Sequence, residues 1–327
     1  MPESVAVSDT MAIMSFSNPP DRRTLGRVAG ALAVDEAFVE KDWYVVQAIR
    51  ALLTLGHADF TPVFSGGTSL LKGHGLIKRF SEDIGFKLSL SEEFLALSHH
   101  QQRRRLGDCR DRLTALWSDL GFTDLEVEAR SGNSFLQFEM SYPTKLGGHA
   151  ALRPHILAEL SAKPPALQPI SRSIASFVAQ FRAAEPEVPA ILCVDPVETA
   201  ADKLSAFAWR SIARDRSHPD DDPTIVRHLH DLSALEAAAT ASAEFPALLL
   251  EALRADTMRG QGAVQDLPPQ ERLKTMIDRV KRDPEYAAEY RQFVESMAFA
   301  GASDIPDFEQ AFAALERLCA MLAPEVA

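Results

Sequence analysis

Residues 63–88, VFSGGTSLLKGHGLIKRFSEDIGFKL, restrict the fold more than any other segment of the sequence. The apolar run before the glycine pair Gly66–Gly67 predicts a short strand, and residues 68–76 predict a helix directly after the pair. Residues 83–90 predict a second strand, which begins with the acid Asp83. Glycine lets the backbone approach an anion closely, and the free N–H groups at a helix start point toward that anion. The segment therefore predicts either a phosphate site or a turn with a purely structural role.

A chain of 327 residues is long enough to form two structural lobes. No apolar run approaches the roughly 18–20 residues that a membrane-spanning helix needs, and the N-terminal residues show no secretory signal. The three cysteines are far apart, which is typical of reduced thiols. We therefore expect a cytoplasmic protein without a membrane partner. The net charge of −12 argues against a general nucleic-acid coat protein, although basic residues cluster at 78–79, 103–105, 203–216 and 272–282.

The hydrophobic pattern along the rest of the chain predicts an α+β protein. Residues 22–56 read as two helices with a break at 34–35, and residues 91–121 read as one long charged helix. Three further strands are expected, at 123–128, 134–142 and 150–160. A short apolar run at 190–194 precedes a region that reads as helical, with helices expected at 196–214, 225–240, 244–256, 270–280, 284–299 and 306–322.

An acid on the strand beside the glycine turn fits the chemistry of nucleotidyl transfer, in which carboxylates hold Mg²⁺ next to bound phosphates. Several motifs of the chain point the same way: GGTSL at 66–70 with RFSEDI at 79–84, EKDWY at 40–44, DPVE at 195–198 followed by Lys203 and Arg210, and RHLHDL at 227–232. In this combination and order, over roughly residues 36–235, the chain resembles the AbiEii/AbiGii toxin family, to which the MenT-type toxins are related.

The resemblance implies a polymerase-β-like nucleotidyltransferase core with a mostly helical C-terminal lobe. The expected domains are a flexible N-terminal arm at 1–20, the core with its N-terminal helices at 21–165, and a helical lobe at 166–327 that closes the nucleotide cleft. The implied reaction transfers NMP from an NTP to an acceptor, with Mg²⁺ as cofactor. Characterised relatives modify the 3′ end of tRNA and so block translation. The implied role is the toxin of a toxin–antitoxin or abortive-infection system, with a cognate antitoxin protein as partner.

The resemblance also implies roles for individual carboxylates and for the glycine turn. Asp83 would be a Mg²⁺ ligand, and Glu159 would be a further catalytic carboxylate at the metal, acting on the attacking hydroxyl. The alternative for Glu159 is an ordinary strand residue that faces solvent. The phosphates of the nucleotide would contact the residues of the turn, which are Gly66, Gly67, Thr68 and Ser69.

Basic residues of the helix expected at 196–214 form the second part of the implied nucleotide site. Lys203, Arg210 and Arg214 are seven and eleven residues apart, a spacing that places them on one helix face. That face would neutralise a triphosphate, with Lys203 best placed by its match to the family motif. A solvated basic stripe is the alternative. Asp231 would bind the nucleotide or orient Lys203, unless it is an ordinary helix carboxylate.

Gly85 is a departure from the family pattern, which has an acid at this position. Residues i and i+2 of a strand face the same side, so an acid here would converge with Asp83 on the metal. Gly85 offers no ligand. Three interpretations stay open: an inactivating substitution, a natural member that binds nucleotide without turnover, or compensation by another acid such as Glu82 or Glu159. The functional alternatives are accordingly a catalytically inactive nucleotide-binding or interaction protein, and a nucleotidyltransferase that acts on a protein or small-molecule hydroxyl.

Overall fold

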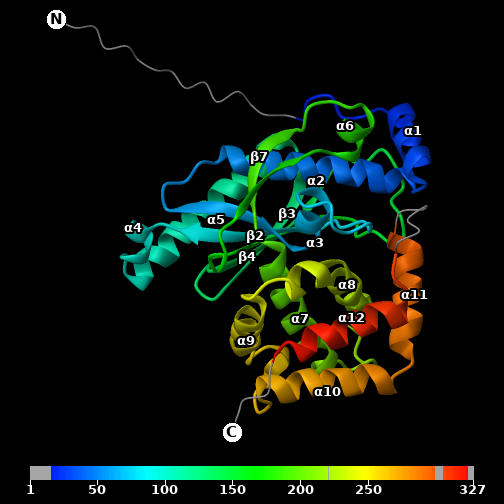
Figure 1. Cartoon of the computed structure of the whole chain (residues 1–327). Coiled ribbons are helices and arrows are strands. Elements are labelled where there is room, and N and C mark those ends of the chain that lie inside the picture. Colours follow the sequence, from blue (N-terminus) through cyan, green and yellow to red (C-terminus); the bar gives the residue numbers. More distant parts are fainter. Residues whose placement is uncertain (1–15, 220, 299–304, 323–327) are drawn as a thin grey trace, which may run out of the picture.

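A mixed seven-stranded sheet forms the centre of the computed structural model, which describes residues 16–219, 221–298 and 305–322 (Figure 1). The strand order is β3-β4-β5-β2-β1-β7-β6. β1 and β2 are antiparallel, and each has a parallel neighbour on its other side, β7 and β5 respectively. The two strands that flank the glycine turn and the acidic motif therefore lie inside the sheet. The strands are β1 Phe60–Ser65, β2 Ile84–Leu90, β3 Thr123–Arg130, β4 Phe135–Ser141, β5 Ile156–Ser161, β6 Ile170–Ile174 and β7 Val188–Cys193.

Two strands differ from the prediction, for physical reasons that the structure makes visible. β5 was expected from residue 150 but begins at Ile156, because the preceding residues form a loop whose carbonyls bind a buried lysine. Lys41 Nζ donates hydrogen bonds to the carbonyl oxygens of Arg153 and His155, at 2.7 and 2.8 Å. β6 was not predicted. It is an edge strand with a mostly exposed, polar sequence, so it lacks the apolar alternation that marks a strand.

The predicted helices are present, but the helix after the glycine pair spans Gly66–Lys72 instead of 68–76, and a larger difference is found at residues 91–121. That segment forms two helices instead of one, because Ser98 starts a new helix with a capping box to Gln101. Helices α7 to α12 gather in a lobe of their own next to the sheet (Figure 1). The α-helices are α1 Arg22–Leu32, α2 Glu36–Thr54, α3 Gly66–Lys72, α4 Glu92–Leu95, α5 His99–Leu120, α6 Phe177–Phe181, α7 Pro196–Ala213, α8 Arg227–Thr240, α9 Phe245–Ala255, α10 Pro269–Arg282, α11 Glu285–Met297 and α12 Phe308–Ala320.

Two separate hydrophobic cores divide the chain into a sheet lobe and a helical lobe. The first core contains buried residues up to Cys193, and the second runs from Ala200 onward and includes Leu70 and Ile77. β6 and β7 belong to the sheet, although they lie C-terminal to the expected domain boundary at 165/166. Most of the expected N-terminal arm, residues 1–15, lies outside the described residues, and Phe16 packs on the rings of Trp43, Tyr44 and Phe122. Within the described ranges, no helix has the length and apolar character of a membrane span.

Candidate functional site

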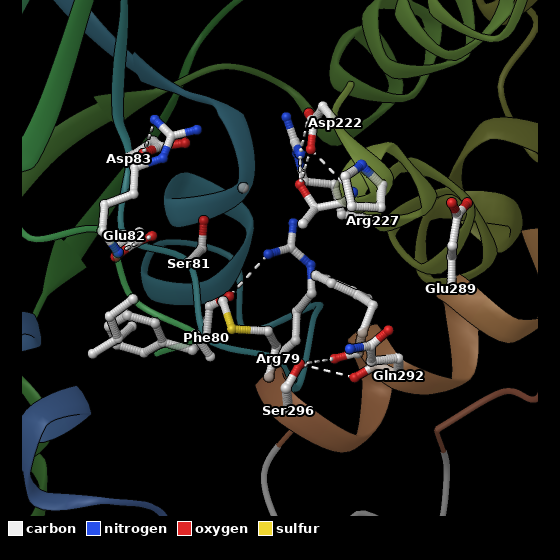
Figure 2. Close-up of a pocket in the computed structure, with 18 of the residues that line it drawn as sticks. Arg79, Phe80, Ser81, Glu82, Asp83, Asp222, Arg227, Glu289, Gln292 and Ser296 are labelled. Atoms are coloured by element: carbon white, nitrogen blue, oxygen red, sulfur yellow. Dashed lines mark hydrogen bonds and ion pairs between the residues drawn. The ribbon is translucent and has the colours of Figure 1, made fainter. Parts of the chain in front are cut away.

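A cleft of about 470 Å³ lies between the acidic motif of the sheet lobe and the helices α8 and α11 of the helical lobe. Figure 2 shows Glu82 and Asp83 on one wall, Asp222 and Arg227 on the opposite side, and Glu289 on α11. Gly67, Arg79 and Lys203 line the same cleft, together with the loop 150–153. The structure thus brings the glycine turn, the acidic motif and the predicted lysine together around one space.

The glycine turn is closely packed against the acidic motif. Gly66 has a φ of +80°, a backbone conformation that favours glycine. A Cβ atom on Gly67 would lie 2.7 Å from Ser81 Oγ and 3.0 Å from Arg79 Nη2, so any larger residue here would have to displace these two side chains. Thr68 Oγ1 donates a hydrogen bond to the carbonyl oxygen of Asp83 at 2.5 Å, and Ser69 is buried. Of the four predicted phosphate ligands, Gly67 lines the cleft, while the Thr68 hydroxyl holds the acidic motif in place.

The two predicted metal ligands lie on neighbouring strands. Asp83 directly precedes β2, has a side chain that is 43 % exposed, and forms an ion pair with Arg153 at 3.4 Å. Glu159 lies on β5, where it pairs in register with Gly85 of β2. Burial and the nearby Asp83 carboxylate raise the pKa of Glu159, while Arg210 opposes that shift. Within the described chain Glu159 forms no hydrogen bond or ion pair, and the cations whose charges act on it are Arg210, Arg153 and Arg130.

Gly85 lies between Ser65 of β1 and Glu159 of β5 in a row across the sheet. Its φ is not positive, so an L residue can adopt this backbone conformation. A Cβ atom here would lie 3.0 Å from Ser65 Oγ and 3.2 Å from Ser65 O, which is tight and requires the neighbouring strand to shift slightly. A side chain at this position would be directed to the same face as Glu159. The place of the missing acid is therefore beside the carboxylates that the sequence singled out.

A fully buried carboxylate connects the two lobes at the inner end of the cleft. Asp231 of α8 accepts hydrogen bonds from Arg79 Nε and Nη2 at 2.7 and 2.6 Å, and its Oδ2 lies 2.7 Å from Lys203 Nζ. Burial by itself would raise the pKa of Asp231, but the charges of Arg79 and Lys203 outweigh it and hold that pKa well below the usual range. Asp231 is therefore ionised and fixes the positions of both cations.

The three predicted basic residues of α7 do not share one site. Lys203 lines the main cleft, whereas Arg210 and Arg214 line a second hollow beside it. The helix ends at Ala213, and Arg214 is the residue at which the backbone leaves the helical conformation. Its guanidinium pairs with Asp221 and Glu289, at 2.6 and 2.7 Å. Arg214 thus links the end of α7 to Asp221 and to α11 within the helical lobe.

Three consecutive charged residues of α2 form hydrogen bonds and ion pairs with segments that surround the cleft. Glu40 accepts a hydrogen bond from the backbone N–H of Lys145 at 2.9 Å. Lys41 is fully buried and pairs with Glu82, next to Asp83. Asp42 pairs with Lys72 of α3. The EKDWY motif therefore supports the site and does not line it.

Sequence reasoning did not single out three residues that border the cleft. Arg79 belongs to the RFSEDI motif and to the basic cluster at 78–79, but no role was predicted for it. Arg153 carried no signal, because its loop is brought to the cleft only by the tertiary fold, and Arg227 was noted only as the first residue of the RHLHDL motif. His228 is buried with no partner for either ring nitrogen among the described residues. Burial and the charge of Lys203 lower the pKa of His228 well below its usual value, so this imidazole is neutral.

Comparison with known proteins gives a matching family and several similar chains among the solved structures. Residues 50–314 match the family described as "Nucleotidyl transferase AbiEii toxin, Type IV TA system". No curated protein matches the sequence. The solved structure of MenT4, a nucleotidyltransferase toxin from Mycobacterium tuberculosis H37Rv, is similar with 19 % sequence identity and a TM-score of 0.46, over 92 % of this chain and 99 % of that chain. The family match covers most of the chain, including the glycine turn, the acidic motif and α7, and the chain therefore belongs to the AbiEii family of nucleotidyltransferase toxins.

Proposed function

We propose that this chain transfers a nucleoside monophosphate from an NTP to the 3′ end of tRNA. The observation that carries the proposal is the charge balance at the inner end of the cleft. Two cations, Arg79 and Lys203, share the single carboxylate of Asp231, so one positive charge remains beside Gly67. A buried cluster with one net positive charge next to a glycine turn favours a bound triphosphate.

Asp83 and Glu159 are the residues that would hold Mg²⁺. This ion is commonly bound by one or two carboxylates together with substrate phosphates and water. The Asp83 side chain is partly exposed, and Glu159 has no hydrogen-bond partner within the described chain, so both offer free oxygens. When bound, the ion supplies charge neutralisation at the phosphates and activation of the attacking hydroxyl.

The chain's own residues have separate tasks in the proposed reaction. Lys203 binds phosphate oxygens, and Asp231 keeps Lys203 and Arg79 in position. The acceptor hydroxyl oxygen attacks the α-phosphorus, pyrophosphate leaves, and Glu159 takes up the hydroxyl proton. The raised pKa of Glu159 suits that task, because a base works best when its pKa approaches the working pH.

Gly85 leads us to propose that turnover by this chain is slow. The acid that would stand beside Asp83 and Glu159 is absent, while the phosphate-binding groups are present. The same observation favours one alternative, a nucleotide-binding protein that does not turn over. A cognate antitoxin protein is the proposed partner that counteracts the toxin.

The test is incubation of the purified chain with labelled NTPs and total RNA, alongside its Lys203→Ala variant. We expect label in the tRNA fraction with the parent chain and none with the variant. Label in protein or in small molecules would redirect the proposal to another acceptor. NTP binding without any transfer, also by a Gly85→Asp variant, would support the non-catalytic alternative.

A further inference from the structure

A second hollow of about 440 Å³ opens beside the main cleft, on the helical lobe. Its walls are the end of α7, the side chains of Asp215, His218, Asp221 and Asp222, and the residues Gly260 and Gln261. Asp222 lines both spaces, so the hollow and the cleft adjoin each other. The residues of the hollow include a tryptophan and an arginine that the proposed reaction does not use.

Arg210 is the unusual residue of this hollow. It forms no hydrogen bond or ion pair within the described part of the chain, and its Nε is buried without a partner. The other cations around the two spaces each have a carboxylate partner: Arg79 and Lys203 at Asp231, Arg153 at Asp83, Arg227 at Asp222, and Arg214 at Asp221 and Glu289. Arg210 therefore keeps its full hydrogen-bonding capacity for a ligand.

An aromatic ring, and not an anion, holds the Arg210 guanidinium in place. Its Cζ lies 4.8 Å from the centre of the Trp209 ring. Gly260 has a φ of +59°, and a Cβ atom there would lie 2.7 Å from Ala213 Cβ and 3.2 Å from the Trp209 ring. A glycine thus allows the chain to pass close to Trp209. The hollow presents a positioned guanidinium next to an indole, a pair of planar groups that suits a stacked base and its phosphate.

The charges around the hollow permit an anion. Three aspartates line it, but Asp221 is paired with Arg214 and Asp222 with Arg227. Asp215 remains unpaired with any cation in the described structure and accepts hydrogen bonds from Ser217. The carboxylates whose charges act on Arg210 are Asp222, which is paired with Arg227, and Glu159.

The position of Arg210 separates it from the triphosphate site. Lys203 and Arg210 are seven residues apart on α7, which places them about 10 Å apart along the helix axis. Lys203 lines the main cleft together with Gly67, whereas Arg210 lines the second hollow and is the cation whose charge acts most strongly on Glu159. Arg210 thus lies toward the carboxylate that would receive the proton of the acceptor hydroxyl.

We propose that this hollow binds the 3′-terminal segment of a single-stranded RNA acceptor, with Arg210 on a backbone phosphate and the Trp209–Arg210 pair against a base. The inference rests on the proposed function, because it names the binding site of the acceptor in that reaction. It assigns Arg210 to the acceptor and leaves the NTP to Lys203. The competing assignment, Arg210 on the NTP itself, is an outcome of the test.

The test measures two affinities on the same proteins. A five-nucleotide single-stranded RNA with a 5′ fluorophore and a free 3′ end reports RNA binding by anisotropy, and calorimetry with Mg²⁺ and NTP reports nucleotide binding. The variants are Arg210→Gln, Trp209→Leu and Lys203→Ala. Arg282→Gln is the matched control, because it removes one charge from a highly exposed position of the same lobe. Circular dichroism verifies that each variant is folded.

We expect Arg210→Gln and Trp209→Leu to weaken RNA binding at least tenfold and to leave NTP affinity unchanged. Lys203→Ala should do the reverse, and Arg282→Gln should change neither affinity appreciably. Loss of NTP affinity in Arg210→Gln would overturn the assignment, as would unchanged RNA affinity or an absence of RNA binding by the parent chain. If the parent chain transfers labelled NMP to RNA but Arg210→Gln and Trp209→Leu bind RNA as tightly as the parent does, the assignment of RNA to the hollow is refuted and the proposed function is not. No incorporation by the parent chain or by Gly85→Asp would refute the proposed function.

Discussion

Replacing Gly85 by aspartate is the perturbation with the most specific expected result. The new carboxylate would lie in register with Glu159 on the neighbouring strand, and strands are about 4.8 Å apart. Two unit charges at about 5 Å repel by about 3 kcal/mol at an effective dielectric constant of about 20. Without a divalent cation, we therefore expect Gly85→Asp to lower the free energy of unfolding by about 3 kcal/mol near neutral pH.

The pH dependence of this loss has a definite sign. Repulsion raises the pKa of the carboxyl pair in the folded state above its value in the unfolded chain, by about two pH units for 3 kcal/mol. Burial and Asp83 already raise the pKa of Glu159 in the parent. The folded variant then binds more protons than the unfolded one, so its stability falls as pH rises. The penalty should be absent below about pH 4 and complete above the raised folded-state pKa. Urea unfolding between pH 4 and 8 measures it.

A divalent cation should reverse the loss, because it binds between the carboxylates that repel each other. Mg²⁺ or Mn²⁺ at about a hundred times its dissociation constant would return about 2.7 kcal/mol. The rate of transfer should also rise, since a further metal ligand is worth several kcal/mol of transition-state stabilisation, or about a thousandfold. Both effects are measured on one preparation, by urea unfolding with and without the cation and by incorporation of labelled NMP.

Two control variants separate the charge from the space that it occupies. Gly85→Ala places the same Cβ atom against Ser65 at 3.0–3.2 Å without a carboxylate, and Gly85→Asn adds the shape without the charge. Both controls keep only the carboxylates of the parent, Asp83 and Glu159, so the cation should stabilise them no more than it stabilises the parent, and neither should show the additional loss of stability with rising pH. If Gly85→Asp transfers no faster than the parent, or loses no stability beyond that of Gly85→Asn, the assignment of Asp83 and Glu159 to the metal is wrong.

Three further predictions follow from the contacts around the cleft. Lys203→Ala should weaken NTP binding at least tenfold, about 1.4 kcal/mol, by calorimetry, and equal affinities would remove Lys203 from the site. Asp231→Asn should lower the free energy of unfolding in urea by about 3–5 kcal/mol, because it leaves Arg79 and Lys203 buried without a carboxylate, and a loss below about 1 kcal/mol would contradict the argument. The pKa of Asp231 in the folded parent is lowered, so the parent keeps the stability from this carboxylate above about pH 4 and loses it as the pH falls further. Arg272 is buried and donates hydrogen bonds to backbone carbonyls, so we assign it a structural role. Arg272→Met should lower the free energy of unfolding in urea by about 1–3 kcal/mol and leave RNA binding unchanged, and weaker RNA binding by a folded variant would refute the structural role.

Periodicity was sufficient to predict most helices of the chain. The helices of the C-terminal lobe each have an apolar face that packs in one core, so their pattern is readable without knowledge of their neighbours. The prediction of a single helix over 91–121 was wrong at Ser98, where a capping box starts a new helix although the helical hydrophobic pattern continues. β6 was missed for the opposite reason, because an exposed edge strand has little apolar alternation to detect.

The site was less accessible to sequence reasoning, because it depends on strand register and burial. Spacing on one helix could not reveal that Arg214 lies past the helix end and pairs with Glu289. Nor could a basic cluster reveal that Arg272 is buried. The proximity of Asp83 to Glu159 follows from the parallel pairing of β2 with β5, which joins segments that are far apart in the sequence.

Asp231 connects the two lobes and explains why a basic residue, Arg79, precedes the acidic residues Glu82 and Asp83 in segment 63–88. Arg79 precedes Glu82 and Asp83 in the sheet lobe, and its guanidinium donates two hydrogen bonds to Asp231 in the helical lobe. Lys203 reaches the same carboxylate from α7, so the relative position of the acidic motif and the phosphate-binding lysine is fixed through one buried group. Because two cations share that group, a triphosphate can bind Lys203 without leaving Asp231 unpaired. The cleft can therefore accept its ligand while the contact that positions both lobes stays intact.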